Sequence, residues 1–222
     1  MDDLCSIPFL KYSSQDIIVA KKLALIGGGG HALSLLDILQ PPLMAAGYVD
    51  FGISPKMPIP FLGNDSEFMS PNTRDEFDIL ITMVSGPDCN LGTRAKVIEC
   101  YSGYTSPSVT APTAIVSSSS HIGVGAVVFH RAVVNTGSDI GCHSIINTGA
   151  IIEHECRIGN NVFIGPGAIV CGGAIIGDNT YIGAGAIIKP GAHIRPSPII
   201  GAGAVVTHDI SIPGTYKGVP AK

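Results

Sequence analysis

The sequence contains no tryptophan and little charge of either sign. Only 14% of its 222 residues are Asp, Glu, Lys or Arg, and 13 basic residues face 17 acidic ones. Proteins that bind nucleic acid or anionic membranes need concentrated positive charge, so the composition argues against both classes. Hydrophobic residues make up 45% of the chain, which is the opposite of the composition that keeps a chain disordered.

The sequence also lacks long apolar runs and an export signal. No apolar run approaches the roughly 18 residues of a membrane-spanning helix, and Met1–Asp3 does not resemble the basic start of a signal peptide. We therefore expect a cytoplasmic protein without a membrane span. Its six cysteines include no Cys-x-x-Cys pair, so we expect free thiols and no metal site.

The sequence does contain a long repeat of six residues. From Val116 to Val206 every sixth residue is Ile or Val, at sixteen successive positions, and a small residue usually stands four residues later. A period of six fits neither a 3.6-residue helix nor a hairpin. It fits short parallel strands joined by tight turns, with three hexads in a triangular coil and about five coils in all. Residues 18 apart should then stack at about 4.8 Å.

Within such a coil the Ile or Val side chain points inward, and the small residue fits the narrow corner. Glycine often follows the inward residue, as at Gly159, Gly165, Gly177 and Gly183. We expect these glycines to serve turns that need a positive φ. An ordinary β-sandwich would not keep one period over some ninety residues.

The first hundred residues alternate between strand and helix patterns instead. The sequence predicts strands at 23–26, 48–50 and 77–84 and helices at 32–40 and 91–101. This alternation predicts a small α/β domain at 1–107, in which helices cover a parallel sheet. The solenoid takes residues 108–222, residues 102–115 form the connection, and residues 1–20 stay unassigned.

A glycine-rich turn, Gly27–Gly30, joins the first predicted strand to the first predicted helix. This is the context of a phosphate-binding turn, because glycines let phosphate approach the backbone and a helix N-terminus offers free N–H groups. Asp50, at the end of the next strand, can accept hydrogen bonds from a ribose or a base. The small size of the domain favours a mononucleotide moiety. A purely structural turn is the alternative, and His31 is either a ligand contact or only the start of the helix.

Three ionisable residues in a row, Glu153, His154 and Glu155, interrupt the solenoid pattern. The hexad frame places His154 at a corner, stacked between Thr136 and Gly172. Glu155 can hold the imidazole in one tautomer, and the bare N–H of Gly172 can stabilise an oxyanion. A histidine, a carboxylate and a free amide within about 5 Å are what acyl transfer requires. A solvated turn without a catalytic role is the alternative.

Together these motifs resemble one family, the sugar-nucleotide branch of the hexapeptide-repeat acyltransferases, also called sialic-acid O-acetyltransferase-like or bacillosamine-type N-acetyltransferases. The similarity rests on the hexads and on the runs Gly27–His31, Ile146–Ala150, Glu153–Cys156 and Gly218–Lys222. It covers about residues 22–222 and implies a Rossmann-like domain followed by a left-handed parallel β-helix. It also implies a homotrimer with active sites between subunits, in the biosynthesis of a bacterial surface polysaccharide.

The reaction that this resemblance implies is acetyl-CoA-dependent N-acetylation of the C4 amine of a nucleotide-linked 4-amino-4,6-dideoxy sugar, without a metal. His154 is then the general base, Glu155 its partner and Asn147 a residue near the reacting centre. The resemblance assigns acetyl-CoA contacts to Gly172, Ala184, Ala202 and Lys222, and nucleotide contacts to Gly29, Gly30, His31 and Asp50. We expect direct transfer, with no acylated cysteine or serine.

Three other functions stay open at this stage. A sugar O-acetyltransferase would use the same residues, and a non-catalytic scaffold would bind the nucleotide without releasing CoA. A γ-type carbonic anhydrase would hold zinc through His130, His143 and His154. Two features depart from the family pattern: Phe163 stands where many members have a second histidine, and residues 85–88 differ from the usual Gly-Asn/Asp-Asn signature.

Overall fold

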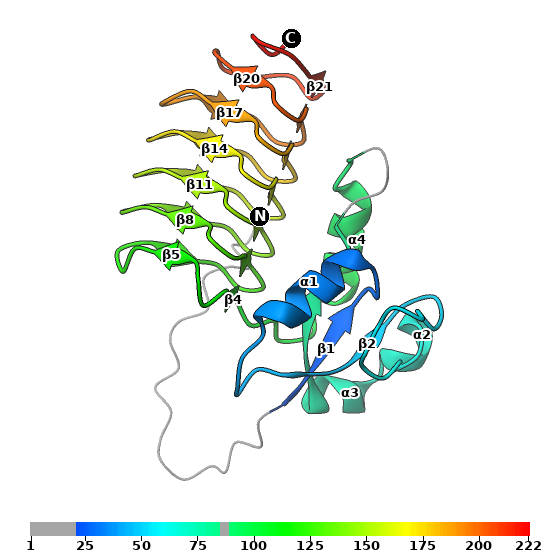
Figure 1. Ribbon diagram of the computed structural model, residues 1–222. Helices are drawn as coiled ribbons and strands as arrows, with labels where there is room; N and C mark the ends of the chain where they lie inside the picture. The colour runs from blue at the N-terminus through cyan, green and yellow to red at the C-terminus, as the bar shows by residue number, and fades with distance from the viewer. Residues whose placement is uncertain (1–20, 85–88) are drawn as a thin grey trace.

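The structure, a computed structural model, describes residues 21–84 and 89–222. The unassigned segment 1–20 and the signature at 85–88 lie outside the described residues. A small α/β domain packs beside the lower part of a tall stack of coils, and the C-terminus lies at the far end of that stack (Figure 1).

The α/β domain has a three-stranded parallel sheet with the order β2-β1-β3. Its elements are β1 (Lys22–Ile26), α1 (Gly30–Ile38), β2 (Ala45–Val49), α2 (Asp65–Phe68), α3 (Pro71–Glu76), β3 (Phe77–Ile81) and α4 (Gly92–Cys100). All five elements predicted from the sequence are present, with ends shifted by at most three residues. The short helices α2 and α3 were not predicted, although Asn64 and Ser70 form capping boxes at their N-termini.

The two faces of this sheet enter different cores, as the alternation of side chains along a strand requires. Leu23 and Leu25 of β1 pack on the face that bears α1, whereas Ala24 and Ile26 pack with the aromatic side chains on the other face. The core on the α1 side continues into Phe163 and other outward-facing residues of the coils. The domain and the coil stack therefore share one hydrophobic core.

The coils form three parallel sheets, which we number in chain order. Sheet 1 contains β4 (Val109–Thr110), β7 (Val127–Val128), β10 (Ile145–Ile146), β13 (Phe163–Ile164), β16 (Tyr181–Ile182), β19 (Ile199–Ile200) and β21 (Thr215–Tyr216). Sheet 2 contains β5 (Ile115–Val116), β8 (Val133–Val134), β11 (Ile151–Ile152), β14 (Ile169–Val170), β17 (Ile187–Ile188) and β20 (Val205–Val206). Sheet 3 contains β6 (His121–Ile122), β9 (Asp139–Ile140), β12 (Arg157–Ile158), β15 (Ile175–Ile176) and β18 (His193–Ile194).

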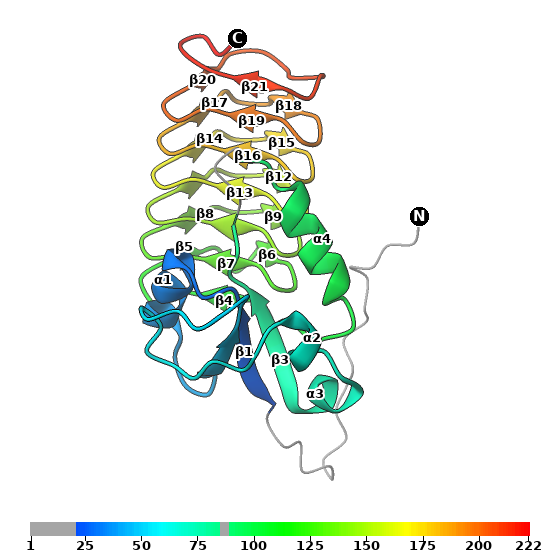
Figure 2. The ribbon, with the colours of Figure 1, turned by 90° about the vertical axis from the view of Figure 1, so that its right-hand side faces the viewer.

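The stacking of residues 18 apart is confirmed by the strand register. Ile146 pairs with Ile164, and Ile152 pairs with Val170. Along most of the stack the inward Ile and Val side chains and the small corner residues are fully buried and make up a single core. The coils run one above another along the whole stack (Figure 2). The predicted connection at 102–115 is too long, because β4 lies within it and β5 begins at its last residue.

The expected role of the glycines that follow the inward residues is wrong. Gly159 and Gly183 do not have a positive φ; a Cβ at either would lie within 2.4–2.5 Å of an atom of the next coil. They are needed for close stacking. The positive φ falls two residues later in each turn, where it is adopted by Gly185 and also by non-glycine residues such as Glu155.

The cysteines depart in part from the expectation of free thiols. Cys89, Cys100, Cys156 and Cys171 are free, whereas Cys142 is disulfide-bonded. Cys5 lies outside the described residues. Within 21–84 and 89–222 there is no helix that is both long and apolar enough to span a membrane.

Candidate active site

His154 lies at the turn from sheet 2 to sheet 3, which we call the second corner. Its Nδ1 is 3.2 Å from Glu155 Oε2, and its side chain is 57% exposed. When Nδ1–H donates to this carboxylate, Nε2 keeps a lone pair that can accept a proton. The pairing predicted between the imidazole and Glu155 is therefore present, and Nε2 is the atom left free for chemistry.

Gly172 lies on the next coil, directly beside this imidazole. A Cβ at Gly172 would be 2.5 Å from His154 Nε2, so the ring fills the space that any side chain would take. The neighbouring Gly173 donates its N–H to the carbonyl of His154 at 2.9 Å. Among the described residues, none accepts a hydrogen bond from the N–H of Gly172. The structure thus brings a proton acceptor and a free N–H together on one corner.

The conformation of Glu155 is unusual for its residue type. Its φ is +58°, in a turn position that Gly173 and Gly191 occupy in the two following coils. The left-handed region costs a non-glycine residue roughly 1–2 kcal/mol. A carboxylate retained at this cost, beside the imidazole of His154, fits a functional role better than a structural one.

The two cysteines that follow this corner in sequence are poor nucleophiles. Burial raises the pKa of the Cys156 thiol, and burial together with Glu153 raises the pKa of Cys171. Both stay protonated at neutral pH, whereas a nucleophilic cysteine needs a thiolate. This chemistry favours direct transfer over an acyl-cysteine intermediate.

Four predicted residues lie at another corner, the turn from sheet 1 to sheet 2, which we call the first corner. Asn147 follows β10, Ala184 follows β16 and Ala202 follows β19. Lys222 is joined to this end of the stack by reciprocal backbone hydrogen bonds with Lys217, which follows β21. In each coil a strand of sheet 2 lies between this corner and the second corner, so the two corners are at opposite ends of one side of the triangle. One chain therefore does not bring Asn147 to His154.

The histidines of the zinc alternative do not converge within the chain. His130 lies at the first corner, His154 at the second, and His143 at the third corner, which joins sheet 3 to sheet 1. No group of three or more His, Cys, Asp or Glu side chains suited to a metal occurs in the described part of the chain. Phe163 also lies away from His154, on the outer face of sheet 1, where it stacks on Tyr181 with ring centroids 4.7 Å apart.

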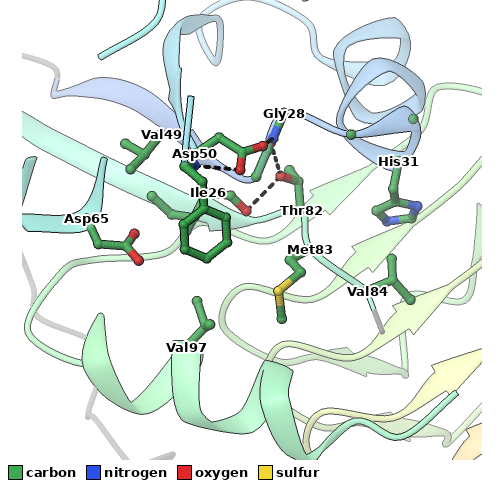
Figure 3. A pocket seen from close by; sticks show the side chains of 14 residues that line it. Ile26, Gly28, His31, Val49, Asp50, Asp65, Thr82, Met83, Val84 and Val97 are labelled. Atoms are coloured by element: carbon green, nitrogen blue, oxygen red, sulfur yellow. Dashed lines mark hydrogen bonds between the residues drawn. The ribbon is translucent and has the colours of Figure 1, made fainter. Parts of the chain in front are cut away.

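The glycine-rich turn lines a pocket of about 380 Å³ at the carboxyl ends of β1, β2 and β3. Gly29, Gly30, His31 and Asp50, all predicted from the sequence, border it. Figure 3 shows His31 and Asp50 in this lining. Asp50 accepts the N–H of Gly28 at 2.7 Å, which holds this carboxylate beside the turn. The described lining contains no Lys or Arg, so backbone N–H groups and the N-terminus of α1 are the available anion donors.

His31 lies at the end of the pocket that faces the coils and contacts Phe129, with ring centroids 5.0 Å apart. Burial, together with the nearby Arg94, lowers the pKa of His31 to about 4. The imidazole is therefore neutral at physiological pH. A neutral imidazole can donate one hydrogen bond and accept another, but it carries no positive charge to pair with a phosphate.

Arg94 of α4 is a residue that the sequence analysis missed. It is 1% exposed and donates to the carbonyls of Met83 and His143 at 2.8 Å and to the side chain of Asn161. Met83 lines the pocket, while His143 and Asn161 belong to the coils. One side chain thus ties the pocket to the stack. The only sequence signal was an arginine within a helix, which ordinarily indicates an exposed face.

Comparison with known proteins agrees with this architecture. The model of the bacterial transferase hexapeptide family (six repeats) matches residues 155–190, and that of the hexapeptide repeat of succinyl-transferase matches 137–166 and 173–208. A search of curated proteins gives no match.

Several solved structures are similar over nearly their whole length. The acetyltransferase domain of PglB from Neisseria gonorrhoeae is 31% identical, with 91% of this chain and 99% of that chain covered and a TM-score of 0.84. Its complex with acetyl coenzyme A is 32% identical, with 91% and 98% covered and a TM-score of 0.81. A histidine-to-asparagine variant of perosamine N-acetyltransferase from Caulobacter crescentus, in complex with CoA and GDP-perosamine, is 31% identical, with 90% and 95% covered and a TM-score of 0.81.

The chain belongs to the sugar-nucleotide N-acetyltransferases of the hexapeptide-repeat family. It is an acyltransferase with a left-handed parallel β-helix, as the resemblance in the sequence implied. The position at which many members carry a second histidine is here Phe163, packed between the coils and the α/β domain. In this hexapeptide-repeat acetyltransferase, His154 therefore has no imidazole from that position beside it within the same chain.

Proposed function

We propose that the protein transfers the acetyl group of acetyl-CoA to the C4 amine of a nucleotide-linked 4-amino-4,6-dideoxy sugar. The observation that carries this proposal is the free Nε2 of His154 beside the bare backbone of Gly172. Two of the relatives support the substrate classes, since one binds acetyl coenzyme A and the other was captured with CoA and GDP-perosamine.

In the reaction that we propose, the neutral amine attacks the thioester carbonyl, and a C–N bond forms. The oxyanion of the tetrahedral intermediate accepts the N–H of Gly172, as in other oxyanion holes. His154 accepts the amine proton at Nε2, and the carboxylate of Glu155 stabilises the imidazolium through Nδ1–H. The C–S bond then breaks, and the CoA sulfur takes the proton. No side chain is acylated.

The proposed site residues of the coils are divided between the first and the second corner, and this division suggests how the site is completed. We assign Asn147 to the reacting centre, and Ala184, Ala202 and Lys222 to the CoA chain, all at the first corner. His154 can meet this group if the second corner of one subunit faces the first corner of another. A homotrimer with sites between subunits satisfies this requirement, and we propose that assembly.

For the nucleotide, we assign the diphosphate to the N–H groups of Gly29 and Gly30 and the ribose to Asp50. His31 borders the path from the pocket to the coils. We place the domain boundary between residues 107 and 108, just before β4. We further propose a cytoplasmic enzyme in the biosynthesis of a surface polysaccharide, because acetyl-CoA and nucleotide sugars are cytoplasmic metabolites.

A thiol-release assay tests this function. Acetyl-CoA is incubated with the enzyme and a panel of UDP-, GDP- and dTDP-linked 4-amino sugars, together with their 4-hydroxy counterparts. We expect release of CoA with an amino sugar, and a loss of about 10²- to 10⁴-fold in kcat for His154→Asn. His121→Asn, an exposed histidine of sheet 3, is the matched control and should keep full activity.

Three outcomes would contradict the proposal. Release with hydroxyl acceptors alone would identify an O-acetyltransferase, and nucleotide binding without any release would identify a scaffold. A near-normal kcat for His154→Asn would remove the general base.

A further inference from the structure

The nucleotide pocket has two chemically different ends (Figure 3). Gly28 and Asp50 lie in its middle, and His31 marks the end beside the coils, where the sugar must leave for the acetyl site. Asp65, from the first turn of α2, lies with Val97 at the opposite end. With phosphates at the glycine turn and ribose at Asp50, the base falls at the Asp65 end.

Asp65 supplies the only polar side chain at that end among the described lining residues. Its neighbours there are the apolar Val49 and Val97. The other polar side chains of the described lining lie away from this end: Asp50 and Thr82 are hydrogen-bonded beside the glycine turn, and His31 lies at the end beside the coils. The base therefore meets a carboxylate, which only accepts hydrogen bonds.

The orientation of this carboxylate is fixed by a buried tyrosine. The hydroxyl of Tyr101 donates to Asp65 Oδ1 at 2.6 Å, and the ring of Tyr101 packs against Phe68 and Tyr104. Burial and the hydrogen bond with Asp65 raise the pKa of Tyr101, so the phenol stays protonated and remains a donor. Each carboxylate oxygen has two lone pairs, so both oxygens of Asp65 can still accept a hydrogen bond from a base.

Among the common bases, guanine suits such an acceptor. Its N1–H and N2–H₂ groups are adjacent donors that a carboxylate can accept together, and the acceptor is charged, which strengthens both bonds. Uracil and thymine present one N–H between two carbonyls, and both carbonyls would face the negative charge. Adenine and cytosine each place an acceptor beside their amino group.

We propose that Asp65 selects a guanine nucleotide, so that the acceptor is a GDP-linked amino sugar. This inference rests on the proposed function, which it makes specific. Good bidentate pairs to a base edge discriminate by about 10- to 100-fold. We expect that margin between GDP and the pyrimidine diphosphates.

Calorimetric titration of the full chain with GDP, UDP, dTDP, ADP and xanthosine diphosphate tests the proposal. Wild type should bind GDP about 10- to 100-fold more tightly than the others. Asp65→Asn should lose most of this affinity for GDP and gain affinity for xanthosine diphosphate, because xanthine has a carbonyl in place of the N2 amine and an amide can donate to it. Asp75→Asn, an exposed acid on α3, is the matched control and should behave as wild type.

A second variant guards against misfolding of Asp65→Asn. Tyr101→Phe keeps the buried ring and removes only the hydroxyl that orients Asp65, so it should weaken GDP binding by several fold and leave UDP binding unchanged. Equal affinity of wild type for GDP and UDP, or an Asp65→Asn variant with unaltered base preference, would overturn the inference alone. Binding of no nucleoside diphosphate at all would overturn the proposed function as well.

Discussion

The coil stack and the α/β domain hold their functional groups in opposite ways. On the coils, His154 is 57% exposed, and its place beside Gly172 follows from the stacking of the backbone. In the domain and at its junction with the coils, His31 is largely buried and Arg94 is 1% exposed, and their places depend on side-chain packing and hydrogen bonds.

Because of this difference, the residues that serve catalysis are distinct from the residues that stabilise the fold. The core of the coils consists of repeated inward residues that are buried along most of the stack, so an exposed corner residue can change without loss of the fold. At the junction, Arg94 joins Met83, which lines the pocket, to His143 of the coils. We therefore expect corner substitutions to alter catalysis and junction substitutions to alter unfolding.

Among the variants that test this contrast, the largest effect is expected for Gly172→Ala at the second corner. A Cβ would lie 2.5 Å from His154 Nε2 and must displace the ring from the free amide, so kcat should fall about 10²- to 10³-fold. Thermal unfolding should change little. Gly214→Ala, in the exposed loop before β21, is the matched control, because its new Cβ meets nothing closer than 3.6 Å. Full activity of Gly172→Ala would show that the imidazole of His154 does not act beside the N–H of Gly172.

Arg94→Met tests the other side of the comparison. It leaves the carbonyls of Met83 and His143 and the Asn161 side chain without their donor, while it also removes a buried cation. We expect a net loss of about 3 kcal/mol in the free energy of unfolding by urea. Arg157→Met, on an exposed position of β12, should cost less than about 0.5 kcal/mol. Equal stability of the two variants would contradict an anchoring role for Arg94.

The contrast also explains how far the sequence could predict each part. On the coils every position has one fixed relation to the residue 18 later, so the rung of His154 and Gly172 could be derived by counting. The same repeat places Asn147 and His154 at different corners, because an advance of seven residues takes the chain along one side of the triangle. The prediction for the glycines was wrong because the repeat shows where a glycine recurs but not why it is needed there. At Gly159 the reason is close contact with the next coil, and at Gly185 it is a positive φ.

In the α/β domain, spacing predicted the sheet, the glycine turn and Asp50, because these depend on local pattern. Arg94 and Asp65 were missed, since their roles depend on partners far away in the chain: Arg94 reaches Asn161, and Asp65 accepts from Tyr101. No local pattern distinguishes such an arginine or aspartate from a solvated one. Long-range packing decides these roles.

Acidification should weaken the junction before it affects the coils. Burial and the nearby Arg94 lower the pKa of His31 and of His143 to about 4, from about 6.5 when unfolded. Between these values the unfolded chain binds more protons, so stability falls as the pH drops from 6.5 toward 4. Each histidine should cost about 2 kcal/mol between pH 7 and pH 5.

Urea unfolding at pH 7 and pH 5 measures this effect. His143→Asn removes one of the two groups and keeps a residue type that tolerates the positive φ at this turn, as Asn161 and Asn179 do. Its loss of stability between the two pH values should be about 2 kcal/mol smaller than that of wild type. The exposed His208→Asn serves as the control and should leave the difference unchanged. An unchanged pH dependence in His143→Asn would show that this imidazole is not held neutral.

The smallest expected effect concerns Glu155, whose backbone conformation lowers stability while its carboxylate pairs with His154. Glu155→Gly removes the carboxylate that pairs with His154 and relieves a φ of +58°, so kcat should fall about tenfold while stability rises by about 0.5–1 kcal/mol. Arg131→Gly relieves the same backbone strain, at a φ of +60° in another coil, and should raise stability with no change in kcat. Activity and unfolding of both variants are measured side by side. If Glu155→Gly keeps full activity, or gains no more stability than a surface change, the strained carboxylate does not serve the imidazole.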